Sequence, residues 1–298
     1  MKKKKNQTPK HQEKRKKIIN NISKSGILLA LVAVLGCSIF YLKNYNKKRE
    51  NKHIVVVIPS YNNIKWFEKN VDSVANQNYD NWSAIYIDDC SKDGTGDAVE
   101  KYIKDHKLEH KIKLIKNKIR CGAMANFYNV IHTCKDSDII VVCDGDDWLK
   151  DKTVLSYINK VYQDNNVWMT YGQYEEFPSG NIGLCKQIPD VVTRHNHFRH
   201  YKWLSSHLRT FYAGLFKKIK KEDFMYEEKF LPATGDMAAM FPMLEMAGDH
   251  AKFISKVLYV YNMDNPLNDY KERLELVLHL DKFVRGKEKY NRIDSVIT

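Results

Sequence analysis

Short apolar runs alternate with helical stripes along the first half of the chain. Residues 53–58 (HIVVVI) are almost continuously apolar, whereas residues 64–77 repeat apolar side chains at helical spacing. The same pattern continues and predicts strands at residues 53–58, 83–87, 111–115 and 139–143, and helices at residues 64–77, 97–106 and 122–134. Strands that alternate with helices of about a dozen residues indicate βαβ units and an α/β fold with a parallel sheet.

The second half of the chain is less regular. Its pattern predicts helices at residues 152–162, 213–219, 237–247 and 270–284, and strands at residues 167–171 and 252–261. Residues 172–200 are rich in Gly, Pro, Asn and His and lack periodicity, which predicts a long functional loop with room for a short β-hairpin. Thr234 is the expected cap of one helix, and Asp236 lies where a carboxylate favours the positive end of that helix.

Polar clusters follow three of the predicted parallel strands. They are residues 60–62 (SYN), residues 88–89 (DD) and residues 144–147 (DGDD). The carboxyl ends of parallel strands meet at one edge of a sheet, where ligands bind in α/β folds. We therefore expect the three clusters to form a single nucleotide site.

The last of these clusters predicts a metal site. Neighbouring carboxylates repel one another, and a divalent cation removes that penalty. Mg²⁺ and Mn²⁺ prefer oxygen ligands and commonly bind substrate phosphates as well. We expect Asp144, Asp146 and Asp147 to hold Mn²⁺ or Mg²⁺ together with a diphosphate; the alternative is an acidic surface turn in which Gly145 supplies the bend.

The positive charge of the chain is confined to its amino-terminal segment. The 298 residues carry a formal net charge of +13, and residues 1–52 account for all of it with 13 Lys and two Arg against two Glu. The remainder is formally neutral, so the folded part has no global basic bias of the kind that attracts nucleic acid. We expect no nucleic-acid partner.

An uncharged stretch within this segment predicts a membrane anchor. Residues 25–42 have no charged side chain and reach the lower limit for a bilayer span. The basic tail at residues 1–24 outweighs the basic stem at residues 43–52, which favours a single-pass protein with a cytosolic amino terminus. The alternatives are a buried core helix, against which the basic flanks argue, and a cleaved signal, because residues 34–37 (VLGC) resemble a lipoprotein cleavage box.

Three motifs, in their order and spacing, resemble those of the inverting glycosyltransferases of family 2. They are residues 58–62 (IPSYN), residues 87–95 (IDDCSKDGT) and residues 144–147 (DGDD). The resemblance implies a single catalytic domain of GT-A fold at residues 53–262, with a mostly parallel sheet flanked by helices, and a helical extension at residues 263–298. It also implies metal-dependent transfer from a nucleotide-sugar donor, by default a UDP-sugar, to a glycan, lipid or protein acceptor. A Q-x-x-R-W motif is absent, which argues against a processive polysaccharide synthase.

The resemblance also assigns roles in nucleotide binding. Tyr61, after Pro59, would pack against the base, and Asp89 and Asp88 would bond the base and the ribose. Gly122 matches the glycine that lets a helix approach the nucleotide.

The remaining implied roles concern the reaction. Asp144 would engage the ribose and, through the metal, the diphosphate. Asp236 matches the position of the catalytic base, although Gly235 departs from the Glu that many members have there; its alternative role is helix capping. Arg209 would contact the diphosphate, and His207 the acceptor or diphosphate, unless His207 is a core histidine.

Two other functions stay open on the sequence alone. A nucleotidyltransferase acting on sugar phosphates also uses carboxylates and Mg²⁺, but it would be expected to have a Gly-rich basic loop where residues 59–62 (PSYN) lie. A catalytically inactive, membrane-tethered sugar-binding protein is the second alternative. The intact carboxylates at Asp144, Asp146, Asp147 and Asp236 argue against it.

Overall fold

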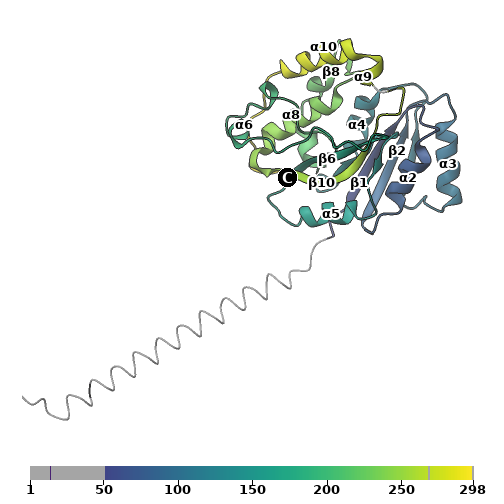
Figure 1. Cartoon of the computed structure of the whole chain (residues 1–298), viewed down its shortest axis with the longest axis horizontal. Helices are drawn as coiled ribbons and strands as arrows, with labels where there is room; N and C mark the ends of the chain where they lie inside the picture. Colours follow the sequence, from purple (N-terminus) through teal and green to yellow (C-terminus); the bar gives the residue numbers. More distant parts are fainter. Residues whose placement is uncertain (1–13, 15–50, 268, 297–298) are drawn as a thin grey trace, which may run out of the picture. The chain divides into compact units, whose positions relative to one another are not determined.

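The computed structural model describes residue 14, residues 51–267 and residues 269–296 (Figure 1). Residues 51–298 form one compact unit. The expected anchor at residues 25–42 lies outside the described residues. Within the described ranges, every helix is too short or too polar to span a bilayer.

A mixed sheet of eight strands forms the centre of the described residues, in the order β3-β2-β1-β4-β7-β6-β10-β5. The strands β1 to β4 are mutually parallel, whereas β7 is antiparallel to its neighbours β4 and β6, and β5 is antiparallel to β10. The bounds are β1 (Ile54–Ser60), β2 (Trp82–Asp88), β3 (Ile112–Lys116), β4 (Ile139–Val142), β5 (Trp148–Leu149), β6 (Met169–Phe177), β7 (Thr210–Tyr212) and β10 (Ala251–Asn262). The predicted mostly parallel α/β sheet is confirmed.

Helices cover the sheet. Helix α2 contacts α3 and β5, α4 contacts β1 and α7, and α8 contacts both α7 and α10. The bounds are α2 (Phe67–Ala75), α3 (Thr95–Asp105), α4 (Ala123–Ile131), α5 (Val154–Val161), α6 (Asp190–Arg194), α7 (Ala213–Lys217), α8 (Gly235–Ala247), α9 (Asp269–Glu272) and α10 (Leu274–Arg285). Short pieces complete the fold: the 3₁₀ turns Phe198–His200, Lys221–Phe224 and Gly248–His250, and the hairpin β8 (Met225–Tyr226) and β9 (Lys229–Phe230).

Strand β1 shows why the apolar runs become central strands. All seven of its residues are buried, and it pairs with β2 on one side and β4 on the other. A strand with neighbours on both edges and helices on both faces has no solvent-facing side, so its sequence is continuously apolar.

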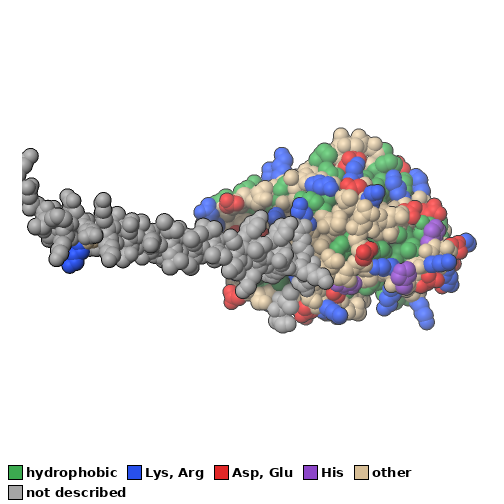
Figure 2. All heavy atoms as spheres, turned by 90° about the horizontal axis from the view of Figure 1, so that it is seen from below, with side chains coloured by type: hydrophobic (Ala, Val, Ile, Leu, Met, Phe, Trp, Pro, Cys, Tyr) green, Lys and Arg blue, Asp and Glu red, His purple; other side chains and the backbone are tan. Residues whose placement is uncertain are grey.

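On the face of the molecule seen in Figure 2, basic and acidic side chains are interspersed.

The structure corrects two expectations in the second half of the chain. The loop predicted at residues 172–200 is wrong at its start, because β6 extends to Phe177. The short hairpin for which the prediction left room is present, since Glu175 pairs with Ile182 in an antiparallel bridge. The predicted cap at Thr234 is right in position but not in its bonding. Thr234 is the N-cap residue of α8, but it has a left-handed backbone (φ 55°) and its side chain makes no capping hydrogen bond. Its hydroxyl donates instead to the carbonyl oxygen of Ala233.

A buried ion pair attaches the end of the chain to α8. The guanidinium of Arg199 donates from Nε to Oε1 of Glu245 at 2.6 Å and from Nη2 to Oε2 at 2.9 Å. Its Nη1 donates to the carbonyl oxygen of Val284 at 2.7 Å, at the end of α10. The amide of Tyr290 donates to Oε2 of Glu245 at 3.0 Å. The end of α10 and the segment at Tyr290 are thereby attached to α8.

Candidate active site

A cavity of about 600 Å³ lies where the strands β1, β2 and β4 end. It is lined by ten of the residues that the sequence singled out: Pro59, Tyr61, Asp89, Gly122, Asp144, Asp146, Asp147, His207, Arg209 and Asp236. Asp88 differs from them. It is buried at the end of β2, where its Oδ2 accepts a hydrogen bond from the amide of Ser91 at 3.3 Å, and it is not a lining residue.

The acidic turn after β4 is attached to the end of β1. A Cβ atom on Gly145 would lie 2.6 Å from the Cβ of Ser60, which is closer than two carbon atoms can approach, so glycine is required here. The amide of Gly145 donates to the carbonyl oxygen of Pro59 at 2.9 Å. The side chain of Asn70, on α2, donates to the carbonyl oxygens of Asp144 at 2.9 Å and Asp147 at 2.7 Å. These contacts fix the main chain of the acidic turn.

Asp147 is fully buried and is held by strand β10. The Tyr259 hydroxyl donates to its Oδ2 at 2.7 Å, and the Asn262 amide donates to its Oδ1 at 2.7 Å. Burial raises the pKa of Asp147 well above its usual value, and the negative charges of Asp146 and Asp144 raise it further. An ionised Asp147 therefore requires a nearby positive charge.

Asp146 contacts other residues than Asp144 and Asp147 do. Its Oδ2 accepts a hydrogen bond from the side-chain amide of Asn265 at 2.6 Å, and its carbonyl oxygen accepts one from Asn262 at 3.1 Å. The carboxylate is thus engaged with the segment that follows β10.

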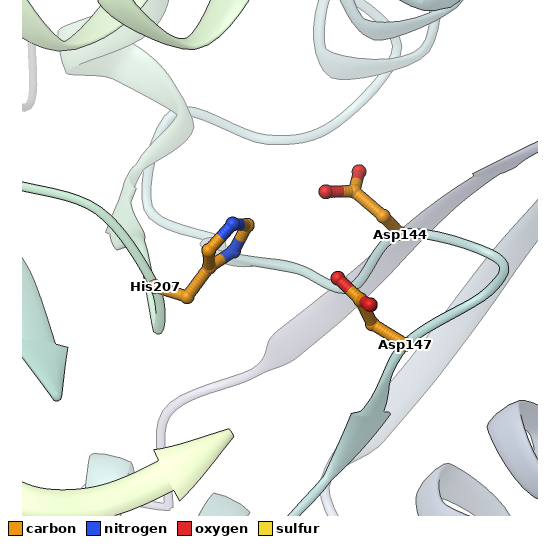
Figure 3. A group of neighbouring side chains, drawn as sticks. All are labelled: Asp144, Asp147 and His207. Atoms are coloured by element: carbon orange, nitrogen blue, oxygen red, sulfur yellow. The ribbon is translucent and has the colours of Figure 1, made fainter. Parts of the chain in front are cut away.

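His207 lies beside Asp144 and Asp147 (Figure 3). Its ring stacks on Tyr259 with centroids 4.5 Å apart, and the side chain is 6% exposed. Burial lowers the pKa of His207 well below its usual value, and the charge of Arg209 lowers it further, so the imidazole is neutral. Its Nδ1 is buried without a hydrogen-bond partner in the described part of the chain.

These three side chains offer a metal-binding group. One ligand atom from each of Asp144, Asp147 and His207 lies within 4.8 Å of the other two. Two carboxylates and a neutral imidazole suit a divalent transition metal such as Mn²⁺. The sequence predicted Asp144, Asp146 and Asp147 as the ligands. Among the described residues, His207 takes the place of Asp146 in the group whose ligand atoms converge.

Arg209 connects the acidic turn to the first turn of α8. Its Nη1 donates to Oδ2 of Asp236 at 3.1 Å, and its Nη2 donates to Oδ2 of Asp144 at 3.4 Å. Oδ1 of Asp236 accepts a hydrogen bond from the amide of Met237 at 2.8 Å. Burial lowers the pKa of Arg209, but Asp236 and Asp144 raise it by more, so the guanidinium stays charged.

Asp89 organises the opposite end of the cavity. Its Oδ1 accepts hydrogen bonds from Asn117 at 2.8 Å and from the amide of Cys121 at 2.9 Å, and its Oδ2 accepts one from the amide of Gly122 at 2.8 Å. The turn that Asp89 holds also carries Arg120, whose guanidinium lies 3.8 Å from the ring centroid of Tyr61. Tyr61 and Gly122, singled out separately in the sequence, thus belong to one local structure.

Sequence reasoning missed the residues that support the acidic turn. Tyr259, Asn262 and Asn265 donate to the carboxylates of the turn, and Asn70 donates to its carbonyl oxygens, yet none of the four belongs to a recognised motif. One signal was available. Asn262 is a polar residue at the end of a long strand pattern, and it lies near the other polar strand ends.

Comparison with known proteins identifies the family. Residues 55–224, more than half of the chain, match the family model "Glycosyl transferase family 2". The putative teichuronic acid biosynthesis glycosyltransferase TuaG of Bacillus subtilis (strain 168) is 30% identical over 99 residues, which are 33% of this chain and 38% of that protein. The Escherichia coli protein WfgD, named as a UDP-Glc:alpha-D-GlcNAc-diphosphoundecaprenol beta-1,3-glucosyltransferase, is 28% identical over 141 residues, 47% of this chain and 53% of that protein. The chain thus spans about half or less of the length of these relatives.

Solved structures with the same fold include other glycosyltransferases. S. aureus TarS 1-349 has a TM-score of 0.57 at 16% identity, covering 78% of this chain and 65% of that one. The mannosyltransferase PcManGT from Pyrobaculum calidifontis, solved with GDP-Man and Mn²⁺, has a TM-score of 0.53 at 19% identity, covering 88% of this chain and 76% of that one. These likenesses confirm the GT-A fold of residues 51–296. With the family model matched over more than half of its length, the chain belongs to glycosyl transferase family 2.

Proposed function

We propose that the chain is a metal-dependent, inverting and non-processive glycosyltransferase that moves a sugar from a nucleoside diphosphate donor to an acceptor hydroxyl. One observation carries the proposal. A single cavity contains the side chains that are candidates for binding the nucleobase, the candidate metal ligands, and Asp236, the candidate general base. Donor, metal and acceptor can therefore meet in one place, which is the main requirement of a displacement reaction.

The donor's nucleoside belongs at the end of the cavity that Asp89 organises. Tyr61 and Arg120 offer flat surfaces for a base, and the turn at Gly122 brings the start of α4 close to it. We infer a UDP-sugar as the donor. The name of WfgD specifies UDP-Glc, and TarS has been solved with UDP-GlcNAc. GDP-Man, present in the PcManGT structure, is the competing donor.

The metal belongs between the acidic turn and His207. Asp144, Asp147 and His207 would hold Mn²⁺ or Mg²⁺, because their ligand atoms converge and Nδ1 of His207 is buried without a partner in the described part of the chain. A bound cation there neutralises charge that develops on the leaving diphosphate. The buried carboxylate of Asp147 would then be paired with a positive charge.

Asp236 is the residue we assign as general base. Its side chain is 34% exposed in the cavity wall, so an acceptor hydroxyl can reach it. It would accept the hydroxyl proton while the hydroxyl oxygen attacks the anomeric carbon from the side opposite the diphosphate, which inverts the configuration. Positioned acid–base groups contribute about 10²–10⁴-fold in rate.

We also propose that residues 25–42 anchor the protein in a membrane as a single-pass segment with a cytosolic amino terminus. The uncharged stretch and the excess of Lys before it support this. The acceptor would be a glycan, lipid or protein on the side where the folded unit lies.

The proposal is tested with the full chain, MnCl₂ and a panel of UDP-Glc, UDP-GlcNAc and GDP-Man. A correct donor binds the folded state and raises the melting temperature. The Asp236→Asn variant should keep that shift in melting temperature. Its rate of sugar transfer to simple glycoside acceptors, measured as released nucleotide, should fall by about 10²–10⁴-fold. Asp97→Asn is the matched control, since Asp97 is an exposed acid in the first turn of α3. If no nucleotide sugar raises the melting temperature, or if Asp236→Asn turns over normally, the proposal is wrong.

A further inference from the structure

One tyrosine of strand β10 contacts all three residues of the candidate metal group. The Tyr259 hydroxyl donates to Oδ2 of Asp147 at 2.7 Å and accepts a hydrogen bond from the amide of Asp144 at 3.0 Å. The ring of Tyr259 stacks on the ring of His207, with centroids 4.5 Å apart and planes 4° apart. The candidate ligands come from two distant parts of the chain, and Tyr259 touches each of them.

The position of Tyr259 is fixed by the sheet. Its side chain is fully buried, and its main chain pairs with Leu149 of β5 on one side and with Tyr174 of β6 on the other. A side chain packed in this way keeps one rotamer on the time average. Both the hydroxyl and the ring plane are therefore set by β10, and not by the loops that carry the ligands.

The hydroxyl of Tyr259 takes the place of a strand partner for the acidic turn. The amide of Cys143 still donates to the carbonyl oxygen of Val57, but the next amide, that of Asp144, donates to the phenol oxygen. A phenol has a single proton, and since this amide points at its oxygen, the proton is left for the carboxylate of Asp147. The hydroxyl thus fixes the spacing between the two aspartates.

The carboxylate of Asp147 can still bind a cation under these contacts. Its Oδ2 accepts one hydrogen bond from Tyr259, and its Oδ1 accepts one from the amide of Asn262, both at 2.7 Å. A carboxylate oxygen has two lone pairs, so these bonds orient the group and leave a lone pair on each oxygen for a metal. Partners that orient ligands in this way are a general feature of metal sites.

The ring of Tyr259 orients the third candidate ligand, His207. The parallel stack sets the plane of the imidazole, whose Nδ1 is buried without a hydrogen-bond partner in the described part of the chain. The converging ligand atoms belong to the three residues that Tyr259 contacts. Asp146, which is held by Asn265 and Asn262, lies outside that group.

We propose that Tyr259 is a positioning residue for the metal. Its hydroxyl sets the spacing of Asp144 and Asp147, and its ring sets the plane of His207, so that the ligand atoms converge before a cation binds. The inference rests on the proposed function, in which this group holds Mn²⁺ or Mg²⁺. It assigns part of the metal affinity to a residue of β10 that no sequence motif indicates.

The test measures the affinity of the full chain for Mn²⁺ by titration calorimetry with MnCl₂. Tyr259→Phe keeps the stacked ring but removes the hydroxyl, so Mn²⁺ binding should weaken by about tenfold, the lower end of the range for partners of metal ligands. Tyr171→Phe is the matched control. Tyr171 is also buried, and its hydroxyl accepts the amide of Ile188 at 3.0 Å, but it does not line the cavity. We expect that variant to bind Mn²⁺ as tightly as the unmodified chain.

Co²⁺ separates a positioning role from a merely structural one. The visible absorption of Co²⁺ depends on the geometry of its ligands, and at saturating CoCl₂ the proteins are compared with their sites filled. Tyr259→Phe should change the absorption bands, whereas Tyr171→Phe should leave them as they are. A Tyr259 that only stabilises the fold would lower the melting temperature and alter neither the bands nor the affinity for Mn²⁺, and that result would overturn the inference.

Hydrogen exchange of the unmodified chain gives a second test, which holds even if Tyr259→Phe fails to fold. MnCl₂ should slow the exchange of the Asp144 amide, because its hydrogen bond to Tyr259 opens when the ligands separate. The Ile188 amide, which is bonded to Tyr171, should be slowed less. Equal slowing of the two amides would contradict the inference.

The two proposals fail in different ways. If the unmodified chain binds no Mn²⁺, the metal dependence in the proposed function is wrong, and the role of Tyr259 falls with it. If the chain binds Mn²⁺ and Tyr259→Phe binds it equally well, only the role of Tyr259 is wrong.

Discussion

The aspartates of the cavity differ in their surroundings, and the surroundings decide what each can do. Asp147 is buried among like charges, Asp89 is surrounded by hydrogen-bond donors, and Asp236 shares a guanidinium with Asp144. The first arrangement disfavours an ionised carboxylate unless a cation is nearby, the second holds a loop, and the third connects the acidic turn to α8. Identical side chains thus acquire separate functions from their neighbours.

Sequence reasoning located these residues but not their directions. The spacing of D-G-D-D placed three carboxylates at one strand end, and all three line the cavity. Which of them face the candidate metal group depends on Asn262, Asn265 and Tyr259, more than a hundred residues later. His207 joins that group because its ring stacks on Tyr259 of β10 and because Arg209, two residues later, bonds Val142 of β4 through its main chain. A local motif does not encode this neighbourhood.

The two candidate ligand sets make different predictions for metal affinity. His207→Ala should weaken Mn²⁺ binding to the full chain by about 10–100-fold, a loss typical of disturbed metal sites. Asp146→Asn should weaken it far less, since Asp146 is engaged with Asn265. Titration calorimetry with MnCl₂ measures both effects, and His106→Ala, an exposed histidine on Tyr102, is the control. A larger loss for Asp146→Asn than for His207→Ala would restore the three-aspartate site.

Asp89 should contribute stability that depends on pH. Burial alone would raise the pKa of Asp89, but hydrogen bonds from Cys121, Asn117 and Gly122 lower it below its usual value. The unfolded chain therefore takes up the proton first as the pH falls. The contribution is present above the unfolded pKa of about 3.9 and is lost as the pH falls through the folded value.

Asp89→Asn measures that contribution. At pH 7 the variant should lose about 1.5–3 kcal/mol in the free energy of unfolding, because the amides of Cys121 and Gly122 lose a charged acceptor. The difference from the unmodified chain should shrink below about pH 4. Urea unfolding followed by tryptophan fluorescence gives both values. A difference that stays constant down to pH 3 would contradict the role of the ionised carboxylate.

At the scale of elements, the sequence predicted the strands and helices that have a clear hydrophobic pattern and missed the shortest strands. Strands β1 and β4 were found because all their residues are buried and nearly all are apolar, whereas the edge strand β3 was found because Lys and apolar residues alternate in it. Strand β7 has three residues, Thr210–Tyr212, which is too few for any periodicity to register. Its place between β4 and β6 is decided by pairing, and this short strand is what brings Arg209 into the cavity.

The buried pair of Arg199 and Glu245 should be essential to the attachment of the carboxyl-terminal segment. Arg199→Met leaves Glu245 buried without a compensating charge, which costs about 3–5 kcal/mol in the free energy of unfolding. Replacing both residues, Arg199→Met with Glu245→Leu, should recover much of that loss. Urea unfolding measures the three proteins. Lys101→Ala, which breaks the exposed pair with Asp105 on α3, should leave the unfolding midpoint unchanged.

At the scale of the whole molecule, the net charge and the candidate active site lie in different parts of the chain. Residues 1–52 carry the entire formal net charge, and the uncharged stretch at residues 25–42 lies inside that segment. The lining that the described residues give to the candidate active-site cavity, by contrast, lies between Pro59 and Val277. Attachment to a membrane and sugar transfer are thus expected to reside in separate parts of the protein.

Cell fractionation tests this separation. The full chain should sediment with membranes and be released by detergent but not by high salt or carbonate, because the anchor that we propose at residues 25–42 would span the bilayer. A variant that lacks residues 1–50 should remain in the supernatant and still bind UDP with Mn²⁺. Release of the full chain by salt alone would indicate attachment through the basic residues instead.

The hydrogen bonds that strand β10 donates to Asp147 have a consequence for the synthesis of the protein on the ribosome. The amide of Asn262 holds a carboxylate 115 positions earlier in the chain. A ribosome therefore completes the acidic motif long before it completes the wall around it. A translation product that stops short of residue 251 carries all three motifs yet lacks the strand that encloses Asp147, so we expect it to consume no nucleotide sugar in the cell.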